Sequence, residues 1–302
     1  MAKLGIMIEG QEGLTWELWK QLCEDVEALG FEALRRSDHV YSVMGVSGRA
    51  CIDPWASLTM AAAWTRRLRL AIMVSPLTFY QAAPLARMAA SVDQLTGGRL
   101  LLGVGAGWNE LEHELYKIPF LTVKERLDRL EEGIRTIRQA WAQSATKPLQ
   151  DPMPILMGGQ GERRALKIVA REAAEWNLTR LDVETFRHKS GVVDAFCAEL
   201  GRDPAEIRRS IMCPFIIGRD QAQLRERAAA VGRVLPRFDG MTPDQVLEAA
   251  AANSLVGTPD QIVARIGEFT ALGVDLFMVQ HFVMDDTEAI RLLAEEVMPR
   301  IA

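Results

Sequence analysis

The sequence predicts an α/β fold, a TIM (β/α)8 barrel with insertions, and three observations lead to it. Short apolar runs alternate with amphipathic helical stretches, and eight such pairs can be counted in the 302 residues. Most runs are apolar throughout, as parallel strands covered on both faces are. The motif Gly103-Val104-Gly105-Ala106-Gly107-Trp108 follows the fourth run instead of the first, and its third glycine comes one place early for the dinucleotide fingerprint of open sheets. Eight units without that fingerprint favour a closed barrel.

The first four units carry clear start and stop signals. Thr15 is suited to cap the first helix and Gly30 to end it. Asp53 and Pro54 are an N-cap and N1 pair at the start of the second helix. These signals predict strands at 4–8, 33–37, 68–74 and 100–104, and helices at 15–29, 54–64, 84–95 and 123–141.

The last four units keep this rhythm around one longer segment. Between the seventh and eighth strands, a helical region of about 220–269 is interrupted at Gly240 and Gly257. We interpret residues 219–259 as a helical insertion between units seven and eight, and we predict a single barrel domain over residues 1–302, because no linker rich in Pro, Gly or Ser divides the chain. Strands are predicted at 155–157, 175–178, 211–217 and 276–279, and the remaining helices at 162–171, 183–200 and 287–297.

Composition narrows the class of protein. A net charge of −5 speaks against a broad nucleic-acid-binding surface. The four cysteines are far apart and form no Cys-x-x-Cys pair or Cys/His cluster, so no metal site is expected. The apolar start of the chain is too short for a signal-peptide core or a membrane span. We expect a cytoplasmic protein that acts on a small molecule, with no nucleic-acid or membrane partner.

Histidines near strand ends are the first candidates for chemistry, because barrel enzymes place their sites at the carboxyl ends of the strands. His39 follows the second strand and stands next to Asp38, where it could donate or accept a proton. A hydrogen-bonded structural histidine is the alternative. His281 follows the eighth strand, whereas His113, in an acidic run, is expected in a solvated loop or helix start and His188 on a helix surface.

A second glycine loop indicates an anionic ligand. Gly158-Gly159-Gln160-Gly161 follows the fifth strand and opens a helix that carries Arg163 and Arg164. Glycines allow backbone N–H groups to approach a phosphate, the helix N-terminus favours negative charge, and arginine adds charge-assisted bonds. A tight turn without a ligand would use the same residues, but the glycine loop after the fourth strand makes an anionic cofactor the preferred interpretation.

Two further features are open to either a functional or a structural explanation. Trp108, at the tip of the fourth strand, could form a wall for a flat ring or a hydrophobic plug. Arg35 and Arg36 are neighbours on one strand, so their side chains cannot both point outward. One of them is expected inside the barrel, where it needs an acidic partner.

Longer motifs resemble one family over nearly the whole chain. They include Arg36-Ser37-Asp38-His39, Asp53-Pro54-Trp55, GGRLLLGVGAGWNELEHELYKIPF from residue 97, ILMGGQGERRALKIVAREAAEWN from residue 155 and LVGTPDQIV from residue 255. The chain resembles the bacterial luciferase-like monooxygenase superfamily, specifically its deazaflavin (coenzyme F420)-dependent oxidoreductase branch. The resemblance implies a luciferase-like barrel, an oxidoreductase and a homodimer.

The resemblance also implies a site for the cofactor. A deazaflavin has carbon in place of the reactive ring nitrogen of a flavin, so it transfers hydride and reacts poorly with oxygen. His39 is implied as the proton donor to a carbonyl or alcohol, imine or activated alkene, with Asp38 beside it and Glu110 or Glu112 as a second proton-transfer group. A non-proline cis peptide or bulge is expected near Met73. The cofactor-binding residues implied are Asp38, His39, Ile72, Met73, Val74, Gly105, Ala106, Gly107, Trp108, Gly158, Gly159, Gln160, Gly161 and Arg163.

The sequence departs from the family pattern at two places, and three other functions are possible alternatives. The segment between Trp141 and Ile155 is short, and Ala173-Ala174 stands where Ala-Asp is common. The same barrel could bind FMN and use oxygen as a monooxygenase, because fold alone does not settle function. A non-catalytic cofactor-binding barrel is a second alternative. A phosphosugar-type enzyme, with Glu9 as its only simple catalytic candidate, is the third.

Overall fold

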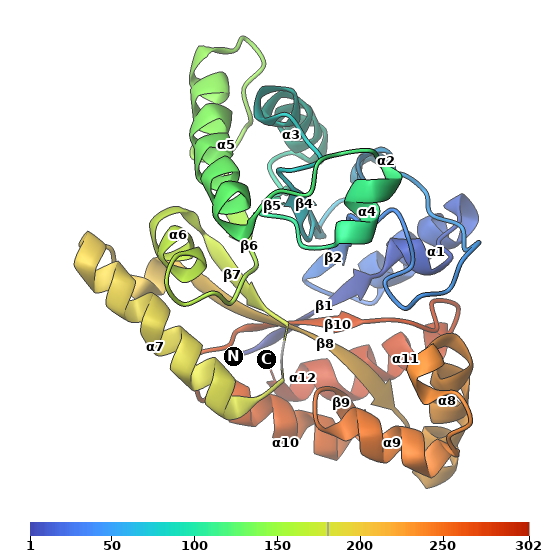
Figure 1. Ribbon diagram of the computed structural model, residues 1–302. Helices are drawn as coiled ribbons and strands as arrows, with labels where there is room; N and C mark the ends of the chain where they lie inside the picture. Colours follow the sequence, from blue (N-terminus) through green and yellow to red (C-terminus); the bar gives the residue numbers. More distant parts are fainter. Residues whose placement is uncertain (180, 302) are drawn as a thin grey trace.

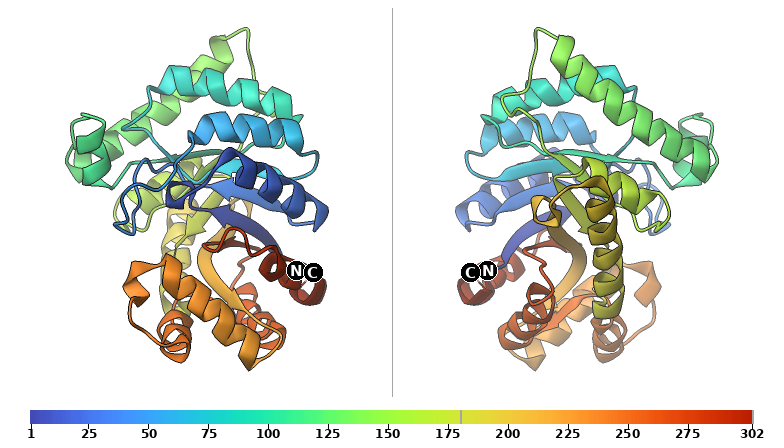
Figure 2. Two further views of the ribbon diagram at one scale, coloured as in Figure 1. Left: turned by 90° about the vertical axis from the view of Figure 1, so that its right-hand side faces the viewer. Right: turned by 90° about the vertical axis from the view of Figure 1, so that its left-hand side faces the viewer.

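Nine parallel strands follow one another around a nearly closed barrel in the computed structural model, which describes residues 1–179 and 181–301 (Figures 1 and 2). Their order is β3-β2-β1-β10-β8-β7-β6-β5-β4. All eight predicted strands are present, and the third is split in two. The bounds are β1 (Lys3–Ile8), β2 (Ala33–Arg36), β3 (Arg69–Ile72), β4 (Ser75–Pro76), β5 (Leu102–Gly105), β6 (Ile155–Met157), β7 (Glu175–Leu178), β8 (Arg208–Ile217) and β10 (Leu276–Gln280).

Helices cover the outside of this barrel (Figure 2). Thr15 and Asp53 cap α1 and α2 as predicted, since their side chains accept hydrogen bonds from the backbone N–H groups of Leu18 and Ala56. In the part of the chain that the structure describes, no helix is long and apolar enough to span a membrane. The bounds are α1 (Trp16–Ala28), α2 (Pro54–Trp64), α3 (Ala82–Thr96), α4 (Glu110–Leu115), α5 (Val123–Gln143), α6 (Ala165–Glu172), α7 (Val183–Leu200), α8 (Gln221–Val234), α9 (Pro243–Ala251), α10 (Pro259–Thr270), α11 (Thr287–Leu292) and, after the π-turn η4 (Leu293–Val297), α12 (Met298–Ile301).

The insertion after β8 has more structure than the sequence predicted. It consists of α8, the 3-10 turn η3 (Pro236–Phe238), α9 and a short strand, β9 (Leu255–Gly257), which pairs in parallel with β8. Helices α8 and α9 lie side by side (Figure 1). Leu224, Val231, Phe238 and Val246 belong to a hydrophobic cluster of its own, separate from the main barrel core. The insertion therefore packs as a subassembly tied to the sheet by β9.

The division of the third predicted strand into β3 and β4 explains two glycines of the motif at residues 103–107. β3 pairs with β2 while β4 pairs with β5, and between them the Met73–Val74 peptide is cis, at the place where the resemblance implied it. A Cβ on Gly103 would overlap the carbonyl oxygen of Ile72, and a Cβ on Gly105 would lie 2.6 Å from Val74 Cγ2. Gly103 is needed because the backbone of Ile72 approaches closely, and Gly105 makes room for the side chain of Val74.

Gly103→Ala is expected to lower the free energy of unfolding by roughly 1–3 kcal/mol, because a backbone oxygen must move to admit the methyl group. Gly191→Ala is the matched control: Gly191 lies within α7, a Cβ there would meet no atom within 4 Å, and alanine favours helix. Urea denaturation measures both. Equal midpoints for Gly103→Ala and the unchanged protein would contradict the packing explanation.

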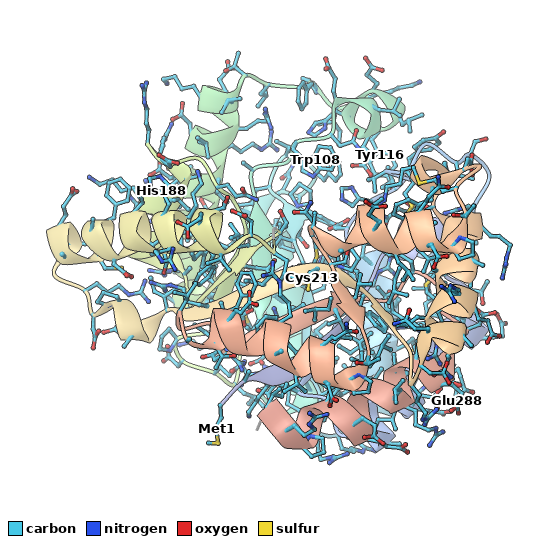
Figure 3. The ribbon with its side chains drawn as sticks, turned by 90° about the horizontal axis from the view of Figure 1, so that it is seen from below. Met1, Trp108, Tyr116, His188, Cys213 and Glu288 are labelled. Carbon is cyan, nitrogen blue, oxygen red and sulfur yellow. The ribbon has the colours of Figure 1, made fainter. Side chains whose placement is uncertain are left out.

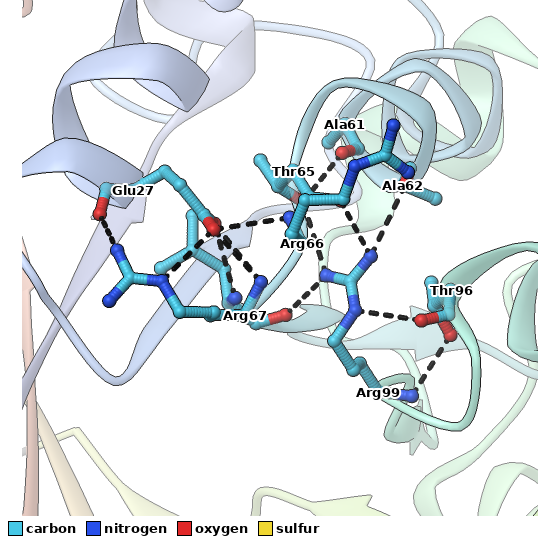
Figure 4. A network of polar contacts seen from close by, with 9 residues as sticks. Glu27, Ala61, Ala62, Thr65, Arg66, Arg67, Thr96 and Arg99 are labelled. Carbon is cyan, nitrogen blue, oxygen red and sulfur yellow. Dashed lines mark hydrogen bonds and ion pairs between the residues drawn. The ribbon is translucent and has the colours of Figure 1, made fainter.

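The amino-terminal side of the barrel is closed by a polar network (Figure 4). The Arg99 guanidinium donates to the carbonyl oxygens of Thr65 at 2.9 Å and Leu68 at 2.8 Å. The Glu27 carboxylate accepts from the backbone N–H of Arg67 at 2.9 Å. These bonds satisfy the backbone groups between α2 and β3, so this end of the barrel serves stability and leaves chemistry to the opposite end.

The two neighbouring arginines point to opposite sides of β2. Arg35 enters the barrel and forms two bonds with the carboxylate of Glu175 on β7, at 2.6 and 2.8 Å, and Ser210 Oγ donates to the same carboxylate at 2.6 Å. Arg36 points outward and donates to Ser57 Oγ on α2 at 2.6 Å. Glu175 is thus the acidic partner that the sequence required but did not identify.

Candidate functional site

A cavity of about 500 Å³ opens at the carboxyl ends of the strands, and its size is typical of a small-molecule site. Eleven of the residues implied by the resemblance border it, whereas Glu110, Ile72, Gln160, Gly161 and Arg163 do not. The eleven are Asp38, His39, Met73, Val74, Gly105, Ala106, Gly107, Trp108, Glu112, Gly158 and Gly159. Bordering residues that the sequence did not single out as ligands include Met7, Asn177, Thr179, Met212 and Gln280.

His39 is held by Glu112, a residue 73 positions further along the chain. Its Nδ1 lies 2.9 Å from Glu112 Oε2, and the backbone N–H of Val40 donates to Glu112 Oε1 at 2.8 Å. Glu112 is buried at the start of α4, whereas Glu110, the second proton-transfer group preferred from the sequence, is exposed on the same helix. Because Nδ1 is engaged by the carboxylate, Nε2 is the ring nitrogen available to a molecule in the cavity.

The surroundings of His39 favour its protonated form. Burial alone would lower the pKa of the imidazole, but the hydrogen bond and charge of Glu112, with the charges of Glu9 and Asp38, raise this pKa above its ordinary value. His39 is therefore a proton source that remains charged to higher pH than a free histidine, which suits a general acid.

Asp38 lies beside His39 in a different environment. Its side chain is buried, and burial raises its pKa to about 6, against the opposing influence of the Tyr80 and Ser75 hydroxyls and of the Arg36 charge. Among the described residues, no group donates a hydrogen bond to its Oδ2. A buried carboxyl oxygen without a partner is a place where a ligand could complete the hydrogen bonding.

The floor and one wall of the cavity are apolar. Met7, Met73 and Met212 form the floor, and Arg35 Nη1 lies 3.7 Å from Met73 Sδ beneath it. Trp108 is two-thirds exposed and packs edge-on against His39, with ring centroids 5.6 Å apart. Figure 3 labels Trp108 beside Tyr116, with His188 on α7 farther to the left. The exposed indole is available as a wall for a flat ring and is not a buried plug.

Contacts behind this wall fix the loop after β5. Gly107 has φ +74°, and a Cβ there would lie 2.5 Å from Thr78 Oγ1, so the loop needs glycine for both backbone conformation and space. Arg126 on α5 donates to the carbonyl oxygens of Gly107 and Leu121. Arg126 thereby orients the segment that presents Trp108.

The second glycine loop differs from the prediction in how it uses its arginines. The helix begins at Ala165, three residues later than predicted, because a turn precedes it. Arg164 pairs with Asp128 and Glu131 on α5, and Arg163 is exposed away from the cavity. Gly158 and Gly159 do border the cavity, so backbone N–H groups, rather than arginine charge, are what this loop offers to an anion there.

Two other histidines are structural. His113 is fully buried, contrary to the solvated position expected from its acidic neighbours, because it packs against Phe79 and Phe120 with ring centroids 4.8 and 4.9 Å apart. His281 stacks on Phe215, and burial lowers its pKa to about 4, so it is neutral at neutral pH. His188 is exposed, as predicted. Of the four histidines, His39 alone borders the cavity.

Comparisons with known proteins agree with this fold. The FMNH2-dependent dimethylsulfone monooxygenase of Pseudomonas putida is 27% identical over 96% of this chain and 90% of its own. Among solved structures, the monooxygenase RslO1 of Streptomyces bottropensis has a TM-score of 0.83 at 22% identity, over 99% of this chain and all of its own. An F420-dependent secondary alcohol dehydrogenase, in complex with an F420-acetone adduct, has a TM-score of 0.82 at 18% identity, with both chains fully covered.

A family model covers most of the chain as well. The model of the luciferase-like monooxygenase family matches residues 8–276, a stretch that contains the strands bordering the cavity except for most of β1 and β10. The chain therefore belongs to the luciferase-like monooxygenase family.

Proposed function

We propose that this protein is an oxidoreductase that transfers a hydride between coenzyme F420 and a small organic substrate, a carbonyl or alcohol, an imine or an activated alkene. The observation that carries the proposal is the His39–Glu112 pair at the cavity. Addition of a hydride to a carbonyl leaves an oxygen that needs one proton, and His39 Nε2 is the ring nitrogen free to supply it. Glu112 keeps that proton in place and favours the charged imidazole.

The residues around the cavity fit a flat anionic cofactor. Gly105 and Gly107 border the cavity beside the exposed face of Trp108, while Gly158 and Gly159 offer N–H groups for a phosphate. The unpartnered Oδ2 of Asp38 offers a carboxyl group, protonated in part near neutral pH, to a polar edge of the ring. When bound, F420 would supply hydride transfer without oxygen chemistry.

An FMN-dependent monooxygenase is the second candidate. It is supported by the Pseudomonas relative, which is named as FMNH2-dependent and matches nearly the whole chain. The same cavity, His39 and glycine loops would serve a reduced flavin, and His39 would again act as a proton donor. The two candidates differ in the cofactor preferred and in whether oxygen is consumed.

Cofactor binding separates the two candidates. F420 and FMN, oxidised and reduced, are titrated anaerobically into the purified chain and followed by fluorescence. We expect F420 to bind roughly tenfold more tightly than FMN, a difference of about 1.4 kcal/mol. In a separate assay in air, we expect no oxygen uptake that depends on substrate. Gly158→Val should weaken F420 binding, because the direction of its Cβ is open and the residue borders the cavity, while Gly191→Val on α7 should not. Tight FMNH2 binding with substrate-dependent oxygen uptake would replace the proposal by the second candidate.

We further propose that the protein is a homodimer joined through α2 and α3. Helix α2 is apolar all round, and Ala56, Met60 and Ala63 are exposed on it. Between α2 and α3 lies a groove bordered by Pro84 and Leu95. Met60→Glu should convert a dimer into a monomer in light scattering, and Val123→Glu, on an exposed part of α5, should leave the dimer intact. A monomeric unchanged protein would contradict this proposal.

A further inference from the structure

Two more cavities lie beside the cofactor cavity, on the side of the insertion. One has a volume of about 420 Å³ and shares Glu9, Val43 and Gln280 with the cofactor cavity. The other, of about 470 Å³, shares Thr179 and Gln280 with it. Pro214, Arg237 and Gln280 border both. We call these two adjoining cavities the side chamber, and the cavity of about 500 Å³ beside His39 the cofactor cavity; the side chamber shares bordering residues with the cofactor cavity.

Arg237 is the cation that faces the side chamber. Its guanidinium carbon lies over the Phe238 ring, 4.7 Å from the ring centroid. Across residues 1–179 and 181–301, no carboxylate forms an ion pair with it and no hydrogen bond engages its side chain. Two other arginines of the insertion are paired, Arg225 with Asp244 and Arg227 with Asp286. Arg237 is therefore held by an aromatic ring while its charge remains open to a ligand.

The segment that carries Arg237 is anchored to the barrel. Arg49, in the loop after β2, donates to the carbonyl oxygen of Val234 at 2.8 Å, three residues before Arg237. The guanidinium of Arg49 also pairs with Glu12 at 2.5 Å, and Glu12 accepts a further bond from Ser42 at 2.8 Å. These bonds fix the end of α8, and the exposed Arg237 follows in the turn η3, with its guanidinium held over Phe238.

The two cavities of the side chamber differ in polarity. Met44, Leu235 and Phe282 make the one that shares Glu9 with the cofactor cavity mostly apolar. Thr179, Asn253 and Ser254 make the other one more polar. Glu9 is the carboxylate on the side that meets the cofactor cavity, where Gln280 Nε2 donates to it at 2.6 Å. An anionic group would be repelled at the Glu9 end and attracted at the Arg237 end, and this charge pattern gives a bound molecule one orientation.

We propose that the side chamber binds the substrate, and that the substrate has an apolar body and one anionic group, a carboxylate or a sulfonate, bound by Arg237. This inference rests on the proposed function, because it places the reacting end of the substrate toward the cofactor cavity. It assigns Arg237 as a specificity-determining residue. A guanidinium matches either anion with paired N–H donors.

The test uses two probes of nearly equal shape, 4-phenylbutyrate and the neutral 4-phenylbutyramide. Calorimetric titration of the full chain at low salt, with and without F420, gives their affinities. We expect the carboxylate to bind about tenfold more tightly than the amide. Arg237→Gln should abolish this preference and Arg237→Lys should retain most of it. Arg233→Gln, an equal charge change on the exposed side of α8, should leave it unchanged.

Each outcome decides a different point. Failure of both probes to bind, or a preference that survives Arg237→Gln, would overturn the proposal. Loss of F420 affinity in Arg237→Gln with the probe preference intact would assign the arginine to the cofactor and overturn it equally. A carboxylate preference that depends on Arg237 in a chain that does not bind F420 would support the side chamber and refute the proposed function, so the two failures are distinguishable.

Discussion

Replacement of His39 by glutamine is expected to slow hydride transfer from reduced F420 to a carbonyl substrate by about 10²–10⁴-fold, the usual contribution of a positioned general acid. The reason is the position of the ring at the cavity, with Nδ1 fixed by Glu112 and Nε2 free. Single-turnover oxidation of reduced F420, with a substrate found in a panel of aldehydes and ketones, measures the effect. His188→Gln, on the surface of α7, is the control and should keep the full rate.

The pH dependence of the rate gives a sharper test of the same pair. The proton donor must be charged, so reduction should slow as pH rises through the raised pKa of His39. Glu112→Gln removes the charge that raises this pKa most, and burial, which lowers it, is then opposed mainly by the charges of Glu9 and Asp38. The decline in rate should move to lower pH.

NMR titration of labelled histidine follows the His39 pKa without any substrate. The chain has four histidines, and His39→Gln assigns the signal. A His39 pKa that is unchanged in Glu112→Gln would show that the carboxylate does not control the proton donor. The pair should also stabilise the fold fully below the unfolded-state pKa of histidine, and that contribution should be lost as pH rises through the folded-state pKa.

Arg35→Met is expected to lower the free energy of unfolding by about 3–5 kcal/mol, because it leaves the buried Glu175 carboxylate without its partner. Both side chains are almost completely inaccessible. The double variant Arg35→Met/Glu175→Met should recover much of the loss, since an apolar pair needs no compensation for buried charge. Lys20→Met, in an exposed pair with Glu24, should cost no more than about 0.5 kcal/mol.

Urea denaturation at several pH values measures the loss of stability in Arg35→Met and its pH dependence. Burial alone would raise the pKa of Glu175, but the charge and hydrogen bonds of Arg35 lower it below its ordinary value. The contribution of Glu175 is therefore present above the unfolded-state pKa and is lost as pH falls through the folded-state pKa. Glu175→Gln keeps the shape and removes the charge. A cost for Arg35→Met no larger than that for Lys20→Met would contradict a stabilising role for the pair.

The order of strands and helices could be predicted because each depends on a local pattern. Thr15 and Asp53 signal helix starts through their own side chains, and apolar runs signal buried strands wherever they pair. β9 was missed because a three-residue strand inside a helical region has no periodicity to detect. The late start of α6 was missed because the turn before it is set by the pairing of Arg164 with α5.

The site was less predictable, because it depends on contacts between distant segments. Glu112 and Glu110 are alike in sequence, and only the path of the Gly107 loop and the pitch of α4 decide which one reaches His39. Glu175 could not be matched with Arg35 across 140 positions by any local pattern. His113 is buried by Phe79 and Phe120, although its neighbours in the sequence are charged.

The insertion between β8 and α10 should tolerate substitutions that the barrel strands would not. Its hydrophobic cluster is distinct from the barrel core and includes only Ile216 from the barrel strands among its buried residues, and the insertion supplies Arg237 to the side chamber. Substitutions in the insertion can change the charge and shape of the side chamber without disturbing the barrel strands that precede His39 and the glycine loops. Under the role proposed for Arg237, exchange of residues 219–257 with those of a relative should change the preference for an anionic substrate and leave the pairing of His39 with Glu112 intact.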